Sequence, residues 1–199
     1  MLNSGADVLI LNHYFAKTVN ALTRAVQFGL RDKMANGKQF AIVVPLISEL
    51  MAKGEGANIK GIPGSSNWNW KLPDEGTKAF VKSYGTEYGM PPSQAVQVCH
   101  AQTLLYADTV ARAEGFNPCA VVEALEGYTF DGPGNGPTVY HKGDHQAFQD
   151  VLVVKGKETP DNEFDAPEVT SVVPVADVTY AVDDKAFAGG DLGRCNAGA

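Results

Sequence analysis

Residues 5–46, GADVLILNHYFAKTVNALTRAVQFGLRDKMANGKQFAIVVPL, decide the fold class of this chain. Two largely apolar runs, ADVLIL at 6–11 (with Asp7 as its one polar residue) and FAIVV at 40–44, enclose a segment at 18–30 with helical periodicity. Nearly continuous apolar runs are typical of parallel strands buried on both faces. A further strand is expected at 59–62. The alternation of strands and helices predicts an α/β unit with a parallel sheet flanked by helices.

The pattern changes after a turn-rich connector at 63–73, which contains both tryptophans. Helices without intervening strands are expected at 74–88 and 93–114, and a third at 118–126, with Asn117 as its N-cap and Pro118 at its first position. The helix at 93–114 is apolar on more than one side, which predicts burial between layers. Strands are expected at the end of the chain, in the runs at 138–140, 151–154, 169–173 (VTSVV) and 178–182 (VTYAV).

Composition and charge exclude several classes of protein. The 199 residues are 44% hydrophobic and 20% charged, with a net charge of −7, which is typical of a globular domain. An acidic chain is a poor candidate for nucleic-acid binding, which relies on basic surfaces. No apolar run has the length of a membrane helix. The first residues also lack the basic segment that opens a secretory signal.

The three cysteines, Cys99, Cys119 and Cys195, have no metal-binding spacing. An odd number leaves at least one of them outside any intramolecular disulfide. We interpret them as small apolar side chains without a chemical role. One disulfide with one free thiol remains open as the alternative.

No catalytic constellation is present, and we expect neither an enzyme nor a cofactor. The glycines at 132, 134 and 136 precede a strand, whereas a dinucleotide loop follows a strand and opens a helix. His141, Asp144 and His145 lie in a sequence typical of a turn, so no metal site is predicted. Cys99 and His100 are neighbours on a helix and point in different directions.

A ligand edge is suggested by the residues that follow the first two strands. Asn12, His13 and Tyr14 come after the first strand, and Pro45 and Leu46 come after the second. Ligands of open α/β sheets bind beyond the carboxyl ends of the strands. The alternative is that His13 and Tyr14 only cap the edge of the sheet.

The order of these segments resembles the type I periplasmic binding proteins of the branched-chain amino acid and amide transport family. The resemblance runs from residue 1 to about residue 157 and is carried by segments rather than by one motif. The clearest are GADVLILNHYFAKTVNALTRAVQFGL (5–30), KQFAIVVPL (38–46), IKGIPGSSNWNW (59–70), the run from Pro73 to Gly115, EALEGYTFDGPGNGP (123–137) and KGDHQAFQDVLVVKGK (142–157).

The resemblance implies two lobes joined by crossovers, of which the first is incomplete here. Residues 1–70 are assigned to the second lobe, residues 74–132 to a helical return onto the first lobe, and residues 133–199 to a return to the second. Members of the family are roughly twice as long. The chain is therefore expected to be the C-terminal portion of such a protein, without its signal peptide.

The resemblance also implies a function and site residues. Family members are periplasmic solute receptors that deliver a small ligand to the membrane permease of an ABC importer. Tyr14 occupies the place of a ligand-contacting tyrosine, and His100 that of an aromatic residue facing the cleft. Trp68 and Trp70 lie at a lobe crossing, as an aromatic wall or as a plug in the hinge.

One departure from the family concerns the ligand. The acidic residue that often holds the α-amino group of the ligand would fall at 44–46, which reads Val-Pro-Leu. Burying an unpaired ammonium there would be costly. An amide, or a carboxylate without the amine, is therefore a better candidate than an ordinary amino acid. A ligand-sensing domain of a regulator or receptor with the same fold is the alternative function, and an unrelated α/β enzyme is a third.

Overall fold

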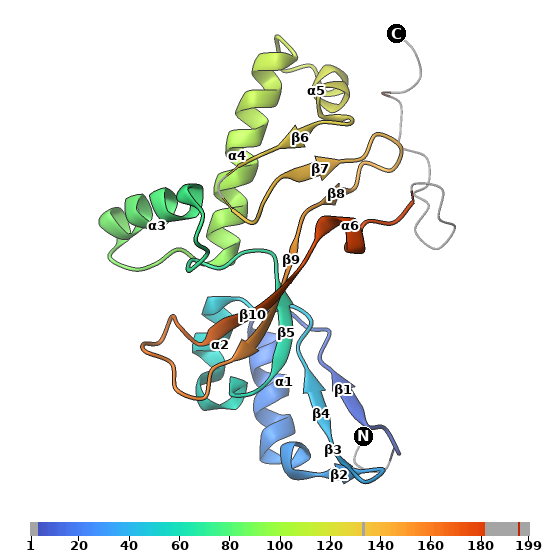
Figure 1. Cartoon of the computed structure of the whole chain (residues 1–199), viewed down its shortest axis with the longest axis vertical. Helices are drawn as coiled ribbons and strands as arrows, with labels where there is room; N and C mark the ends of the chain where they lie inside the picture. Colours follow the sequence, from blue (N-terminus) through green and yellow to red (C-terminus); the bar gives the residue numbers. More distant parts are fainter. Residues whose placement is uncertain (1–3, 133, 182–194, 196–199) are drawn as a thin grey trace. The chain divides into compact units, whose positions relative to one another are not determined.

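The computed structural model describes residues 4–132, 134–181 and 195, and the chain divides into two compact units (Figure 1). Unit 1 combines residues 1–69 with 152–172, and unit 2 combines residues 70–151 with 173–199. Residues 133–151 fall in unit 2, with the helices that precede them, because they supply two strands of its sheet. The assignment of segments to a first and a second lobe stays a prediction.

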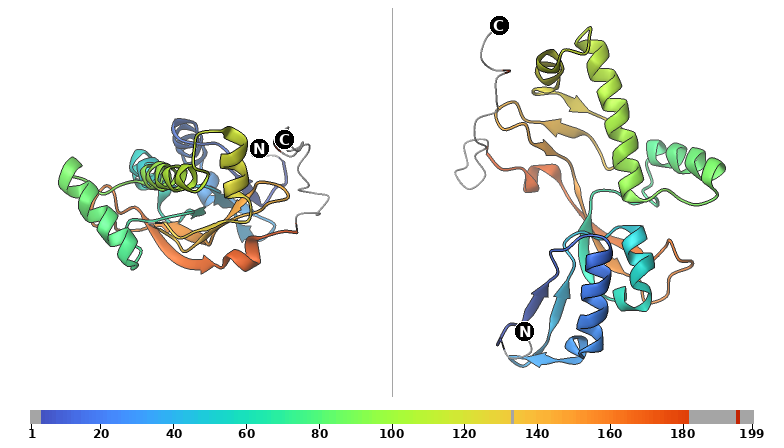
Figure 2. Two further views of the ribbon diagram at one scale, coloured as in Figure 1. Left: turned by 90° about the horizontal axis from the view of Figure 1, so that it is seen from above. Right: turned by 180° about the vertical axis from the view of Figure 1, so that it is seen from behind.

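The first half of unit 1 contains the predicted parallel strand pair. Strand β1 (Val8–Ile10) pairs with β4 (Ala41–Val43) in parallel, with Leu9 opposite Ile42. Helix α1 (Ala16–Gln27) connects them and lies beside β4 in Figure 1 and in the right-hand view of Figure 2. A short turn of 3-10 helix (Leu30–Asp32) and a hairpin of β2 (Met34–Ala35) with β3 (Lys38–Gln39) complete the connection.

The prediction that β1 is buried on both faces is wrong. Val8 is 47% exposed and Ile10 is 61% exposed, whereas Ile42 is buried. Side chains alternate along a strand, so Val8 and Ile10 share one face of the pair, and Leu9 and Ile42 share the other. Only the second of these faces contributes to the core.

The parallel sheet is also smaller than predicted, because residues 59–62 do not form its third strand. After α2 (Glu49–Glu55), residues Gly56–Ile59 form a turn of 3-10 helix. The N–H of Ile62 turns back to the carbonyl of Ile59, and the strand begins later, as β5 (Pro63–Ser66).

Strand β5 belongs mainly to an antiparallel sheet. It pairs with β9 (Val151–Gly156), which also lies next to β10 (Pro167–Val173). A parallel bridge between Val44 and Gly64 links β5 to the strand that precedes it. The core of unit 1 therefore combines residues from its two segments, 1–69 and 152–172. Its buried side chains include Leu22, Ile42, Val44, Ile47, Trp68, Leu152 and Val154.

Unit 2 begins with the three predicted helices, and each starts at a side-chain cap. Helix α3 (Glu75–Tyr88) is capped by Asp74, α4 (Gln94–Arg112) by Ser93 and α5 (Pro118–Leu125) by Asn117. Each capping oxygen accepts a hydrogen bond from the first turn, which satisfies an otherwise free N–H.

The prediction that α4 is buried between layers is wrong. Leu105 and Thr109 are buried, but Leu104 and Tyr106 are exposed. Helix α5 packs against α4, and the sheet of unit 2 has only short strands. The described elements therefore cover one face of α4 and leave the other exposed. No described helix combines the length and the apolar character needed to cross a membrane.

The sheet of unit 2 is antiparallel and contains β6 (Thr129–Phe130), β7 (Thr138–Tyr140) and β8 (Ala147–Phe148). The glycines at 132, 134 and 136 lie in the connection between β6 and β7, as expected for turn residues. The strand expected at 178–182 is not formed in the described part, because α6 (Val175–Val178) ends there. Residue 182 lies outside the described residues.

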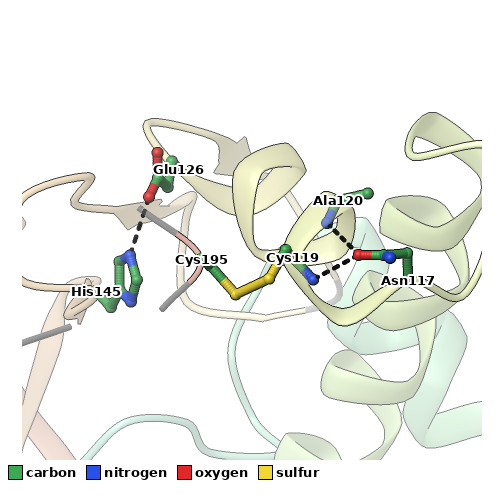
Figure 3. Close-up of a disulfide and its surroundings, with 6 residues drawn as sticks. All are labelled: Asn117, Cys119, Ala120, Glu126, His145 and Cys195. Atoms are coloured by element: carbon green, nitrogen blue, oxygen red, sulfur yellow. Dashed lines mark hydrogen bonds and ion pairs between the residues drawn. A yellow bond between two sulfur atoms is a disulfide. The ribbon is translucent and has the colours of Figure 1, made fainter. Parts of the chain in front are cut away.

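A disulfide corrects the interpretation of the cysteines. Cys119, in the first turn of α5, is bonded to Cys195 near the end of the chain, with their Cα atoms 4.9 Å apart (Figure 3). Cys99 is an exposed free thiol. The sequence did not identify this pair, because 76 positions separate the two cysteines and their spacing does not show that they are close in space.

Candidate ligand-binding site

The candidate site in unit 1 lies at the carboxyl ends of β1 and β4. The N–H of Leu11 donates to the carbonyl of Val43 (2.9 Å), so the ladder continues to the last residues of both strands. Asn12, His13 and Tyr14 follow β1, and Pro45 and Leu46 follow β4. Because the strands are parallel, both loops leave the same edge of the pair.

The side chains on this edge are accessible. Asn12, His13 and Leu46 are exposed, Pro45 is half-buried, and Tyr14 is 48% exposed. These five residues therefore form a surface that a ligand can reach.

Strand β5 brings a third loop to this edge. The N–H of Ser65 donates to the carbonyl of Pro45 (3.2 Å), and the N–H of Ile47 donates to the carbonyl of Ser65 (2.9 Å). These parallel contacts place Asn67 and Trp68, which follow β5, near the loop after β4.

Asn67 and Trp68 differ in what they offer a ligand. Trp68 is 0% exposed, and its carbonyl accepts a hydrogen bond from the hydroxyl of Ser66 (2.8 Å). In this structure the indole ring is packed and presents no accessible wall. The side-chain oxygen of Asn67 is buried and has no hydrogen-bond partner within the described chain, which leaves it able to accept one.

Phe15 is not among the residues predicted from the sequence, but it belongs to this edge. It is the N-cap of α1, with φ 53° and ψ −133°, a region that bulky residues rarely adopt. Its ring is exposed and lies 6.3 Å from that of Tyr14. Backbone strain of this kind is concentrated at ligand-binding sites. The aromatic pair in the run NHYF was visible in the sequence, but its backbone conformation was not.

A small hollow adjoins Phe15. Its volume is about 170 Å³, and it is lined by Phe15, Ala16, Val19, Asn20, Leu50 and Met51. The start of α1 and the start of α2 therefore enclose apolar space beside the exposed aromatic rings.

The charges at this edge are unusual for a site that holds an ammonium group. The loops at 12–15 and 44–48 contain no Asp or Glu. Helix α1 has no acidic residue in its first turn, and no side chain caps its N-terminus in the described part of the chain. The partial positive charge of a helix N-terminus is therefore not offset there.

Trp70 and His100 belong to unit 2, so they are described apart from the loops of unit 1. Lys71 Nζ lies over the ring of Trp70, 5.1 Å from its centroid. His100 is exposed on α4, and its ring stacks on Phe80 of α3 at 4.5 Å with an interplanar angle of 12°.

A large open pocket lies beside His100. It has a volume of about 830 Å³ and is lined by α3, α4 and the glycine-rich connection: Asp74, Phe80, His100, Leu104, Phe130 and Asp131 are among its side chains. Phe80, which the sequence analysis did not select, contributes a ring to this pocket and supports that of His100.

The histidines at 141 and 145 stabilise a turn. His145 Nε2 and Lys142 Nζ each lie 3.1 Å from an oxygen of Glu126 (Figure 3 shows the first contact). The hydrogen bond with His145, followed by that with Lys142, holds the pKa of Glu126 below its ordinary value. His141 Nδ1 lies 3.5 Å from Asp144. Within the described ranges, no three His, Cys, Asp or Glu side chains are arranged to hold a metal.

Comparison with known proteins decides the family. The sequence profile of the periplasmic binding protein family matches residues 1–161. The chain belongs to this family. A search of curated proteins gave no significant match.

Solved structures of the family share the fold. A substrate-binding protein of an amino acid ABC transporter from Pseudomonas fluorescens is 23% identical (TM-score 0.71), covering 84% of this chain and 44% of that one. A periplasmic binding protein from Burkholderia mallei is 19% identical (TM-score 0.76), covering 93% and 48%. A solute-binding protein from Rhodopseudomonas palustris, in complex with 3,4-dihydroxybenzoic acid, is 14% identical (TM-score 0.70), covering 88% and 47%.

The present chain therefore spans about half the length of these relatives. The chain has part of the α/β fold of a periplasmic binding protein. The family consists of binding proteins rather than enzymes.

Proposed function

We propose that this chain is the ligand-binding part of a solute receptor of an ABC importer, and that its ligand is a small carboxylate or amide. The observation that carries the proposal is the exposed edge at the carboxyl ends of β1 and β4. Tyr14, His13 and Leu46 gather there, beside the N-terminus of α1. Membership of the periplasmic binding protein family supports the receptor role.

Residues from each unit are assigned to the site on different grounds. Asn12, His13, Tyr14, Pro45 and Leu46 share one edge of unit 1 through the parallel β1–β4 pair. Trp68, Trp70 and His100 are assigned by resemblance to the family; because Trp68 is buried, the role proposed for it is that of a plug and not of an aromatic wall. His100 is accessible and stacked on Phe80, which suits it to contact a planar ligand.

The ligand class follows from the charges at the edge of unit 1. An α-amino acid needs a carboxylate partner for its ammonium group, and the loops at 12–15 and 44–48 offer none. A ligand carboxylate, in contrast, is favoured by the N-terminus of α1. The exposed rings of Tyr14 and Phe15 suit an aromatic acid, and a relative has been solved with 3,4-dihydroxybenzoic acid.

The mechanism needs no chemical step. Ligand affinity that differs between an open and a closed arrangement of two lobes shifts the equilibrium toward the closed one. The permease then distinguishes the closed, loaded receptor from the open one.

The proposed compartment is the periplasm. The disulfide between Cys119 and Cys195 supports it, because disulfides persist in oxidising compartments such as the periplasm and are rare in the cytosol.

A thermal-shift screen tests the proposal. The purified chain is heated with matched pairs of compounds, such as leucine with 4-methylpentanoate, and 3,4-dihydroxybenzoate with its amide. A ligand at 100 times its Kd adds about 2.7 kcal/mol to the free energy of unfolding. We expect the carboxylates or amides to raise Tm and the amino acids to leave it unchanged. A shift with amino acids alone would contradict the proposed ligand class.

A further inference from the structure

A second pocket lies in unit 1, at the amino-terminal end of β4, away from the loops that carry the candidate ligand site. It has a volume of about 530 Å³ and lies between residues 39–42 on one side and residues 60–63 on the other. Arg31 and Glu158 complete its lining. The pocket shares no lining residue with the candidate ligand site.

The pocket exists because the ladder between β4 and β5 does not extend that far. The N–H of Ala41 donates to Asp7, and the carbonyl of Val43 accepts from Leu11, so Ala41 and Val43 face β1. The backbone groups of a strand alternate in direction, so those of Ile42 face the opposite side. Val44, two residues on, confirms this direction by donating to the carbonyl of Pro63 (3.1 Å).

Ile42 has no backbone partner on that side in the described chain. At the position where a neighbouring strand would supply a partner for Ile42, the N–H of Ile62 instead donates to the carbonyl of Ile59. The carbonyl of Ile62 accepts from the N–H of Gly156. The side chain of Ile42 is buried. Its N–H is therefore a donor that faces the pocket, and buried backbone donors without partners are rare.

A fixed guanidinium lies in the lining of the same pocket. Arg31 Nη2 donates to the carbonyls of Asn58 (2.6 Å) and Lys60 (2.8 Å). The carbonyl of Arg31 itself accepts from the side-chain amide of Gln39 (2.9 Å). The two Nη2 contacts hold the guanidinium in place, and the contact with Gln39 holds the backbone of Arg31. The Nε and Nη1 groups of Arg31 keep donors that no described residue accepts. A guanidinium held in this way is pre-organised for an oxyanion.

The charges of the pocket favour an anion. Lys60 contributes a second cation, and Glu158 is the one carboxylate among the residues that line it. The ammonium group of Lys60 has no ion-pair partner in the described ranges. The whole chain, in contrast, carries a net charge of −7, which repels anions. Anion binding would therefore report this local arrangement and not the overall charge.

We propose that this pocket binds a small oxyanion, a phosphate or carboxylate group, through Arg31, Lys60 and the N–H of Ile42. The inference is independent of the proposed function, because it concerns other residues at the other end of β4.

The test is a titration of the ¹⁵N-labelled full chain, followed by NMR, with inorganic phosphate in one arm and succinate in the other. Sodium chloride keeps the ionic strength constant. We expect saturable shifts of the Ile42 amide and of the Arg31 Nε–H signal. Saturation by phosphate identifies an inorganic oxyanion, and saturation by succinate identifies an organic acid. Either result supports the binding of an oxyanion group in this pocket. Shifts confined to the residues around Tyr14, or none at all, would overturn the proposal.

Three charge variants, none of which alters the Arg31 anchor, make the test specific. Lys60→Met is expected to weaken binding about tenfold, because it removes a charge-assisted contact. Glu158→Gln is expected to strengthen it, because it removes the one negative charge in the lining. Lys38→Met is the matched control: Lys38 is exposed on β3 and does not line the pocket. Equal affinity in the Lys60→Met and Lys38→Met chains would overturn the assignment.

Discussion

The backbone of Gly64 lies directly against that of Val44, at the parallel bridge that joins β5 to the chain leaving β4. A Cβ atom at position 64 would meet the carbonyl oxygen of Val44 and the side chain of Ile47. This close approach places the loop after β5 next to the loop after β4. The candidate ligand edge of unit 1 therefore depends on a glycine within β5, outside the loops that form the edge.

Gly64→Ala is expected to destabilise unit 1 by about 1–3 kcal/mol, as overpacking in a core does. The added methyl group has no space unless β4 and β5 move apart. Urea unfolding followed by tryptophan fluorescence measures the effect, because Trp68 is buried in unit 1. Gly115→Ala is the control, since a Cβ there meets nothing within 4 Å. An unchanged midpoint for Gly64→Ala would show that the two strands are not held this closely.

The disulfide between Cys119 and Cys195 is expected to stabilise unit 2. Closing a loop of 76 residues reduces the entropy of the unfolded chain and is worth at most about 4–5 kcal/mol. Cys119→Ser, or reduction of the wild type, should therefore lower Tm. Cys99→Ser should not, because Cys99 is an exposed free thiol. A Tm that does not change on reduction would mean that the bond contributes nothing to folding.

The carboxyl group of Glu55, at the end of α2, is expected to make stability depend on pH. The residue is 4% exposed, and neither carboxyl oxygen has a hydrogen-bond partner in the described chain. Burial raises its pKa from 4.5 to about 7. Between these values the folded state binds more protons than the unfolded state. The free energy of unfolding therefore falls as pH rises from 4.5 to 7, and stays low above 7.

Glu55→Gln should remove that part of the pH dependence. At pH 8 the variant is expected to be more stable than the wild type, by up to about 3 kcal/mol. Unfolding in urea at several pH values provides the measurement, and Glu168→Gln, at an exposed position of β10, is the control. Parallel pH profiles for Glu55→Gln and the wild type would rule out this role for the carboxyl group.

The absence of an acidic residue at 44–46 should determine which ligands bind. Leu46→Glu places a carboxylate on the exposed edge, and we expect it to weaken a carboxylate ligand about tenfold or more through like-charge repulsion. Leu46→Gln, which has the same shape without the charge, should retain most of the affinity. Calorimetric titration of both variants gives the comparison. Equal losses in the two would assign the effect to shape.

How much could be predicted from the sequence differs between the elements. The parallel β1–β4 pair and the helix between its strands, α1, were predicted, because apolar runs and helical periodicity are local signals. The capped helices α3, α4 and α5 were predicted for the same reason. The strand at 59–62 was misplaced because Ile62 turns back to Ile59, and β5 pairs with β9, some ninety residues away, which no local pattern shows.

The candidate site shows the same limit. Tyr14, His13 and Leu46 could be placed at one edge from strand order alone. The strained backbone of Phe15 and the complete burial of Trp68 depend on packing between distant segments, so the sequence could not show them. The exposure of Val8, Ile10 and Leu104 was also missed, because an apolar pattern indicates which face can be buried but not what covers it.

The most direct test of the proposed function is a calorimetric titration of the wild-type chain and its Tyr14→Ala variant with the best carboxylate or amide from the screen. Phe28→Ala is the control, because Phe28 is an aromatic residue that is 70% exposed at the far end of α1. We predict that Tyr14→Ala weakens binding at least tenfold, while Phe28→Ala matches the wild type. Equal affinity in all three chains would contradict the placement of the ligand at the edge of β1 and β4.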